Sequence, residues 1–189
     1  YPADGSMWFG TYCGQLLRVS PDGLTMTDVP VTGNVTPSDI RDIVTDSRGN
    51  LYIGHAAGIS VKAPGGEWRH YTPSTVSMPM PEMVRTLHID RRGLLYAGSH
   101  GAGIQVYDSV MNHLTSYAAW ENVPRKLPFN FVNHIVAGQG NDGWAATDRG
   151  LVKIITDRDS VRVYGRAEGL SDTNVRAIAL DSGNCLWLS

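Results

Sequence analysis

The chain has 189 residues, of which 42% are hydrophobic and 18% are charged, and these proportions exclude an intrinsically disordered protein. The net charge is −2, from 16 basic and 18 acidic residues, and Lys and Arg are scattered singly, so we expect no nucleic-acid partner. No apolar run approaches the ~20 residues of a membrane-spanning helix, so we expect no direct membrane insertion of this segment.

The first expected element is a short strand built on an aromatic residue, MWFGT (7–11). In the second unit an alternating strand comes first: IRDIVTD (40–46) leads through a Gly-containing turn to LYIGH (51–55). A Gly-rich link and two further strands follow, ISVKA (59–63) and EWRHYT (67–72). The same order recurs along the chain, with alternating and aromatic strands at VRTLHID and LYAGS, VNHIVAG and GWAAT, and VRAIALD and LWLS.

The aromatic residue of each second strand marks a repeat. These residues are Trp8, Tyr52, Tyr96, Trp144 and Trp187, and they are separated by 44, 44, 48 and 43 residues. A period of about 40–45 residues with four strands per unit is typical of a β-propeller blade. We therefore predict an all-β fold, a β-propeller of four-stranded antiparallel blades. The expected units are about 1–36, 37–80, 81–128, 129–171 and, incomplete, 172–189.

The repeat also predicts how the blades are held together. One such sheet cannot bury both faces alone, so we expect Ile, Leu and the strand aromatics to pack between neighbouring blades. The first unit lacks an inner strand, whereas the last residues supply an inner strand and a second strand. We interpret the chain as about four and a half blades of a longer array, which would leave its remaining blades as partners.

The two cysteines give little information about compartment. Cys13 and Cys185 have no CxxC spacing, and the repeat places them in different units at opposite ends of the strands. We expect them to be unpaired thiols, because a disulfide needs Cα atoms within about 7 Å of each other.

A family resemblance comes from the pattern GLSDTNVRAIALDSGNCLWL (169–188), with echoes at 40–54 and 84–98. Together with MWFGTYCGQL and LYIGHAAGI, it resembles the two-component regulator propeller repeat, whose second strand reads Leu-Trp-Ile-Gly-Thr before a Gly-rich link. The resemblance covers essentially the whole chain. It departs in the fourth unit, where Ala146 replaces the signature Gly and Gly138 replaces the turn Asp.

The resemblance implies the periplasmic sensor region of a hybrid two-component system. Such proteins carry two seven-bladed propellers, a β-sandwich domain, a membrane span and a cytoplasmic histidine kinase, and they commonly bind oligosaccharides released from glycans. From it we expect a periplasmic location, an oligosaccharide ligand, downstream domains of the same chain as partners, and a possible homodimer. We expect no cofactor and no metal.

Three arginines at equivalent positions are the first candidates for ligand contact. Arg41, Arg85, Asn133 and Arg176 occupy equivalent positions at the start of the inner strands. The three arginines would lie near the channel mouth and could hold a carboxylate or sulfate. The alternative is that each pairs with a nearby acid, for which Asp39, Glu82 and Asp172 are the obvious partners.

The links that share the mouth of the channel supply the other candidates. His55 and His100 occupy nearly the same link position, one per blade. They would offer a sugar hydrogen bond or a role in the surface link, and the alternative is that they coordinate a metal or act as a base, for which two histidines without a third ligand are weak evidence. Trp120 lies in an insertion, 118–130, where it either stacks on a sugar or folds back onto the blade edge. The candidate site residues are Tyr12, Arg41, His55, Arg85, His100, Trp120, Arg149 and Arg176.

Three kinds of function fit such a chain. A glycan lyase or hydrolase needs a committed catalytic pair, whereas the acidic residues here fall at equivalent repeat positions, as packing or capping would produce. We therefore expect a non-enzymatic, ligand-sensing ectodomain region. The alternatives are a protein-binding surface or secretion-associated scaffold and, second, a propeller lyase or hydrolase.

Overall fold

The computed structural model describes residues 4–122 and 124–189, and in this part of the chain nearly all regular structure is β-strand. The strands form five antiparallel sheets, which we call blades 1 to 5. Blade 1 comprises β1 (Met7–Gly10), β2 (Leu16–Val19) and β3 (Met26–Asp28). Blade 2 comprises β4 (Asp42–Thr45), β5 (Leu51–His55), β6 (Gly58–Lys62) and β7 (Trp68–Tyr71).

The remaining blades continue the same order. Blade 3 comprises β8 (Val84–Ile89), β9 (Leu95–Ser99), β10 (Ile104–Tyr107) and β11 (His113–Tyr117). Blade 4 comprises β12 (Val132–Ala137), β13 (Gly143–Thr147), β14 (Gly150–Ile155) and β15 (Ser160–Tyr164). Blade 5 comprises β16 (Ile178–Leu180) and β17 (Leu186–Leu188). Two short 3₁₀ turns, η1 (Thr156–Arg158) and η2 (Arg166–Glu168), flank β15.

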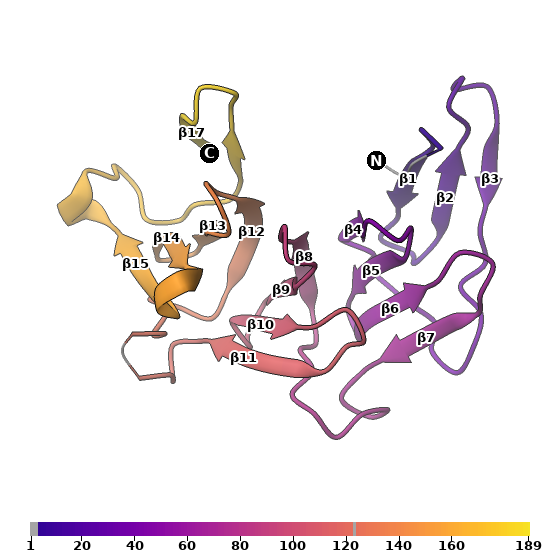
Figure 1. The fold of residues 1–189 in the computed structure, drawn as a ribbon, viewed down its shortest axis with the longest axis horizontal. Helices are drawn as coiled ribbons and strands as arrows, with labels where there is room; N and C mark the ends of the chain where they lie inside the picture. Colours follow the sequence, from indigo (N-terminus) through magenta and orange to yellow (C-terminus); the bar gives the residue numbers. More distant parts are fainter. Residues whose placement is uncertain (1–3, 123) are drawn as a thin grey trace.

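The blades follow one another around an open arc, with blade 1 and blade 5 at its two ends (Figure 1). The first strand of each later blade lies innermost, because β4, β8, β12 and β16 contact one another in that order. The predicted all-β architecture of four-stranded antiparallel blades is confirmed by blades 2, 3 and 4. Both cysteines are free and exposed.

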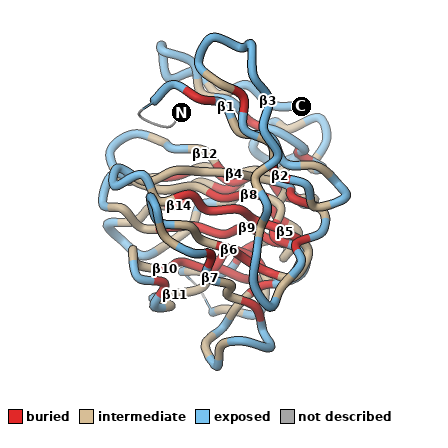
Figure 2. Tube along the Cα trace, turned by 90° about the vertical axis from the view of Figure 1, so that its right-hand side faces the viewer, coloured by how far each residue is buried: buried red, intermediate tan, exposed pale blue. Residues whose placement is uncertain are grey.

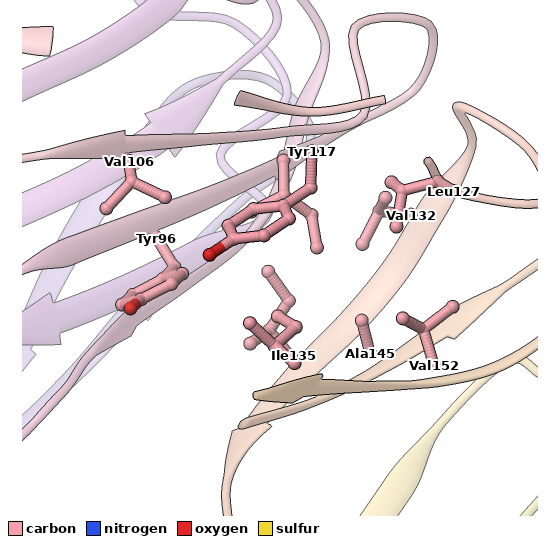
Figure 3. Close-up of a cluster of buried hydrophobic side chains, with 10 residues drawn as sticks. Tyr96, Val106, Tyr117, Leu127, Val132, Ile135, Ala145 and Val152 are labelled. Atoms are coloured by element: carbon pink, nitrogen blue, oxygen red, sulfur yellow. The ribbon is translucent and has the colours of Figure 1, made fainter. Parts of the chain in front are cut away.

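The hydrophobic core is a series of layers between blades. Buried residues concentrate in the strands, while the connecting links are mostly exposed (Figure 2). The layer between blades 3 and 4 joins Tyr96, Val106 and Tyr117 to Val132, Ile135, Ala145 and Val152, with Leu127 of the connecting link beside them (Figure 3). Each blade thus buries a face that it could not bury alone.

In blades 2 and 5 the turn Asp precedes the strand aromatic residue by six positions, and hydrogen bonds within each blade explain this recurring spacing. The Asp46 carboxylate accepts hydrogen bonds from the backbone N–H groups of Arg48 and Asn50, at 2.9 and 2.8 Å, and from the Tyr52 hydroxyl at 3.3 Å. In blade 5 the indole N–H of Trp187 donates to Asp181 at 2.9 Å. The aromatic residue therefore stabilises its own turn. The Tyr52 ring also packs in the layer shared with blade 3, whereas the Trp187 side chain is 65% exposed.

Two kinds of link meet on one face of the arc, which we call the mouth face. One kind joins the second and third strands of a blade, and the other joins the outer strand of one blade to the inner strand of the next. Backbone hydrogen bonds connect them, as in Asp39 N–H to Tyr12 O at 2.8 Å, Met83 N–H to Ala56 O at 2.7 Å and His100 N–H to Met83 O at 3.1 Å. The opposite face, which we call the base face, carries the Asp turns and the links from third to outer strand.

The first three outer-to-inner links are also fastened to the blade that follows them, each through a proline carbonyl. Pro30 O accepts from the indole N–H of Trp68 at 3.1 Å, and Pro79 O accepts from the Tyr107 hydroxyl at 2.6 Å. In the longer link, 118–131, Pro124 O accepts from the backbone N–H of Val161 in β15 at 2.9 Å. The insertion thus lies along the outer strand of blade 4 and covers part of its open edge.

Candidate functional site

The mouth end of the inner strands carries a repeated irregularity. The pairing register shifts between Val84 and Thr86 in β8 and between Val132 and His134 in β12, so that Arg85 and Asn133 are the extra residues of β-bulges. A bulge re-aims the side chain of its extra residue, and bulges are frequent beside functional sites. The equivalent residues Arg41 and Arg176 precede β4 and β16. The structure thus gives Arg41, Arg85, Asn133 and Arg176 equivalent places at the mouth end of the inner strands.

Arg41 is neutralised by its own blade. Its guanidinium forms an ion pair with Asp39 and lies 5.7 Å from the centre of the Tyr12 ring, which is itself 75% exposed. Tyr12, Asp39 and Arg41 thus form one cluster on the mouth face, at the junction of blades 1 and 2. For this arginine the structural interpretation, pairing with a nearby acid, holds.

Arg85 and Arg176 differ from Arg41. Within residues 4–122 and 124–189, neither arginine forms an ion pair, so the expected partners Glu82 and Asp172 are not engaged by them. Arg85 is half-buried and Arg176 is exposed. At the fourth equivalent position, the Asn133 amide donates to Asp148 at 2.8 Å and to Val175 O at 2.9 Å. Two of the three arginines therefore keep their charge available at the mouth.

His55 does not reach the surface. It is fully buried, and its Nδ1 accepts the backbone N–H of Ala57 at 3.2 Å, which leaves the proton of the neutral ring on Nε2. Nε2 then donates to the Ser60 hydroxyl at 2.9 Å, Ser60 donates to His70 Nδ1 at 2.8 Å, and His70 Nε2 donates to Thr32 O at 2.9 Å. This hydrogen-bond chain crosses blade 2 and holds the preceding link.

The register places the two histidines one position apart in equivalent links. Thr11, His55, Ser99 and Thr147 each accept a backbone N–H of the following link, so they share one structural position. His100 follows Ser99 by one residue and points outward instead. Burial lowers the pKa of His55 to about 4, with the nearby His70 as a second cause, so the ring is neutral at pH 7.

A row of aromatic and basic side chains forms at the junction of blades 3 and 4. The His100 and Phe131 ring centres are 3.7 Å apart, and those of Phe131 and Phe129 are 4.7 Å apart. The Arg149 guanidinium lies 4.5 Å from the centre of the Phe129 ring. These four side chains, His100, Phe131, Phe129 and Arg149, are called the aromatic row below. All four are half-buried or exposed.

Phe129 and Phe131 were missed by the sequence analysis. The available signal was composition, because the chain has only 3 Phe residues and two of them stand in the link that breaks the repeat spacing. Trp120 is 61% exposed, and the body of its insertion follows the outer edge of the blades, where Arg125 donates to Thr115 Oγ1 at 2.6 Å.

The described part of the chain offers hydrogen-bond donors, charges and aromatic faces rather than a metal centre. No group of three or more His, Cys, Asp or Glu side chains that could hold a metal occurs among the described residues. Nor does this part of the chain contain a helix that is long and apolar enough to cross a membrane. The arrangement is suited to reversible binding of a polar ligand on a broad surface.

Comparison with known proteins identifies the architecture. The chain matches no family model and no curated protein. It matches the solved extracellular domain of BT3049 from B. thetaiotaomicron, described as a hybrid two-component system, with a TM-score of 0.84 and 27% identity over 99% of this chain and 25% of that one. The chain is a β-propeller segment. It resembles the two-component regulator propellers, as the sequence pattern indicated.

Two further matches show the breadth of this propeller fold. The extracellular domain of BT4673, also from B. thetaiotaomicron and also described as a hybrid two-component system, has a TM-score of 0.76 and 21% identity over 99% of this chain and 24% of that one. Streptogramin B lyase has a TM-score of 0.74 and 15% identity over 98% of this chain and 59% of the lyase. The segment therefore spans about a quarter of the length of the two extracellular domains. Both of these proteins are described as extracellular domains of hybrid two-component systems.

Proposed function

We propose that this β-propeller segment belongs to the periplasmic ligand-sensing region of a two-component sensor, and that it recognises a glycan-derived oligosaccharide. The observation that carries the proposal is the match to the BT3049 extracellular domain over 99% of this chain, at 27% identity. The kinase that would receive the signal lies elsewhere in the protein. No bond is made or broken in the segment itself.

The ligand would bind on the mouth face. Arg85 and Arg176 bring charges that no ion pair of the described chain neutralises, and His100 and Arg149 flank them in the links. Tyr12, Arg41 and Trp120 would add contacts at the margins of this surface. His55 would not contact the ligand; it holds its link in place through the hydrogen bond from the Ala57 N–H. A ligand that binds one blade arrangement more tightly than another would shift the population and so pass on a signal.

A catalytic function is not favoured by the same surface. The carboxylate of Asp39 is paired with Arg41, and that of Asp148 accepts the Asn133 amide, so structural contacts account for both. The match to streptogramin B lyase, at 15% identity, reflects the fold alone.

The test is a thermal-shift screen of the complete extracellular protein against neutral, sulfated and uronic-acid oligosaccharides. A ligand that binds only the native state must raise the apparent melting temperature, by an amount that grows with ligand concentration. We expect one glycan class to give such a shift, and Arg85→Ala and His100→Ala to reduce it. Trp120→Ala tests the margin of the surface.

Arg158→Ala, an exposed residue of η1 on the base face, is the matched control and should leave the shift unchanged. Absence of a shift with every glycan class, on a folded protein, would contradict the proposal and favour a protein-binding scaffold.

A further inference from the structure

We infer that the aromatic row is a subsite for an acidic sugar residue, with the ring face packed on Phe129 and Phe131 and the carboxylate or sulfate held by Arg149. This inference rests on the proposed function and deepens it, because it names the chemical class of the ligand and a place for its charge. Neither phenylalanine follows from the repeat pattern.

The row is fixed in place by the backbone on both sides. Phe131 pairs with His100 in an isolated antiparallel bridge, and Phe131 O accepts the backbone N–H of Asp148 at 3.2 Å. The link that carries both phenylalanines is therefore tied to the second-to-third strand links of blades 3 and 4. A surface whose rings are already held loses little conformational entropy when a ligand binds.

The rings supply the apolar part of the subsite. The Phe131 ring centre lies 3.7 Å from that of His100 and 4.7 Å from that of Phe129, at interplanar angles of 32° and 57°. Partly exposed aromatic rings offer flat apolar area to the C–H face of a sugar ring. In the described chain His100 has no side-chain hydrogen bond, so its ring nitrogens are available to sugar hydroxyls.

Arg149 supplies the charge. Its guanidinium lies over the face of Phe129, a geometry that leaves the N–H edges free for a bidentate contact with a carboxylate or sulfate. No carboxylate of the described residues pairs with it: the neighbouring Asp148 is engaged by Asn133. The unpaired Arg85 and Arg176 on the same face add positive potential, which favours an anion.

A comparison within the chain distinguishes this cluster from other arginine–aromatic contacts. Arg41 lies over Tyr12 and Arg18 lies over Trp8, but each also forms an ion pair, with Asp39 and with Asp4. Arg162 lies over Tyr164 in the outer strand β15, away from the mouth. Arg149 combines an aromatic support, an unpaired charge and a position on the mouth face.

The test compares acidic and neutral ligands on the complete extracellular protein by calorimetric titration. The probes are oligogalacturonates with their carboxyl-reduced counterparts and sulfated disaccharides with their desulfated counterparts, so that the two sources of negative charge are separated. We expect an acidic probe to bind more tightly than its neutral counterpart. Arg149→Gln should weaken acidic binding about 10- to 100-fold and leave neutral binding unchanged.

Further variants separate the parts of the subsite. Phe129→Leu and Phe131→Leu should weaken both acidic and neutral probes several-fold, and Arg149→Lys should recover only part of the acidic preference because it lacks the planar fork. Arg158→Gln, the same charge change on the base face, should have no effect.

Two results would overturn the inference. If glycans bind with no acidic preference, or if Arg149→Gln leaves that preference intact, the acidic subsite is wrong while the proposed sensor function stands. If no probe binds the folded protein, the subsite is wrong and the proposed function fails with it.

Discussion

At the residue scale, a difference of one position in a link decides whether a histidine has a structural role, as His55 does, or is partly exposed, as His100 is. His55 takes the position that Thr11, Ser99 and Thr147 occupy in blades 1, 3 and 4, and it caps its link as they do. Its imidazole also hydrogen-bonds to Ser60, which in turn bonds to His70. The shorter side chain of a Thr or Ser at this position would not reach Ser60. The His55 ring thus has a structural role inside blade 2, although a histidine at this position suggested a ligand-binding residue.

His55 should make stability depend on pH. Its pKa is about 4 in the folded protein, against 6.5 for an ordinary histidine. Because the folded protein binds this proton less readily than the unfolded chain, the free energy of unfolding is highest above pH 6.5 and falls as the pH is lowered toward 4, by roughly 3 kcal/mol at most. Burial lowers the pKa values of His88 and His113 too, with the same sign.

We expect His55→Thr, which supplies the cap found in blades 1 and 4, to reduce this acid sensitivity in denaturant titrations at pH 7.5 and pH 4.5. His100→Thr controls for the loss of an exposed histidine. An acid response as steep in His55→Thr as in the wild type would show that the buried ring does not cause it.

At the element scale, the signature glycine of the second strand marks where the inner strand of the next blade approaches. A Cβ at Gly98 would lie 2.6 Å from Thr86 Cγ2 and 2.7 Å from Val132 Cγ1, and one at Gly54 would lie 2.7 Å from Val84 Cγ1. Blade 4 has Ala146 at this position, and its methyl group is buried in the layer that includes Val175 and Ile178. The replacement of the signature Gly by Ala146 therefore reflects a different side-chain packing between blades 4 and 5.

Gly98→Ala should lower the free energy of unfolding by about 1–3 kcal/mol, because the added methyl group must displace Thr86 or Val132. Gly143→Ala is the matched control in β13, where the new Cβ would meet its nearest atoms at 3.6 Å, an ordinary contact distance. We expect that control to stay within about 0.5 kcal/mol of the wild type by chemical denaturation. Equal effects of the two substitutions would remove the packing explanation.

At the scale of the whole molecule, the inner strands are joined by a ladder of side chains. Asp42 accepts the backbone N–H of Leu87 at 2.7 Å, Thr86 accepts that of Ile135 at 3.0 Å, and His134 Nδ1 accepts that of Ile178 at 3.2 Å. These acceptors occupy equivalent positions in blades 2, 3 and 4. Burial raises the pKa of Asp42, the one carboxylate in the ladder. Blades 2, 3 and 4 are thereby each held to the next blade by a specific bond between inner strands, in addition to the apolar layer.

Replacing Thr86 by Val keeps the shape of the side chain and removes the acceptor. The N–H of Ile135 then stays buried without a partner, which should cost about 1–3 kcal/mol in the free energy of unfolding. We expect faster hydrogen exchange at the Ile135 amide as the local readout. Thr45→Val is the control, since the described residues include no side-chain hydrogen bond of Thr45. Unchanged exchange at Ile135 would disprove the role of this bond.

The sequence by itself determined the blade. Strand alternation, the Asp turn and the aromatic residue six positions later are local features, so their recurrence predicted the sheets and the order of the links along the chain. It also placed Arg41, Arg85 and Arg176 at equivalent positions, because equivalence follows from register within the repeat.

Only the tertiary structure decided which of these residues are available to a ligand. Arg41 and Arg85 are identical in the repeat, yet one is paired and the other is not. His55 and His100 differ by one position in register, which turns one ring inward and the other outward. The aromatic row joins three links that are distant in sequence, through contacts from residue 100 to residue 149. Such pairings depend on how neighbouring blades pack, and packing between blades is not a periodic property of the sequence.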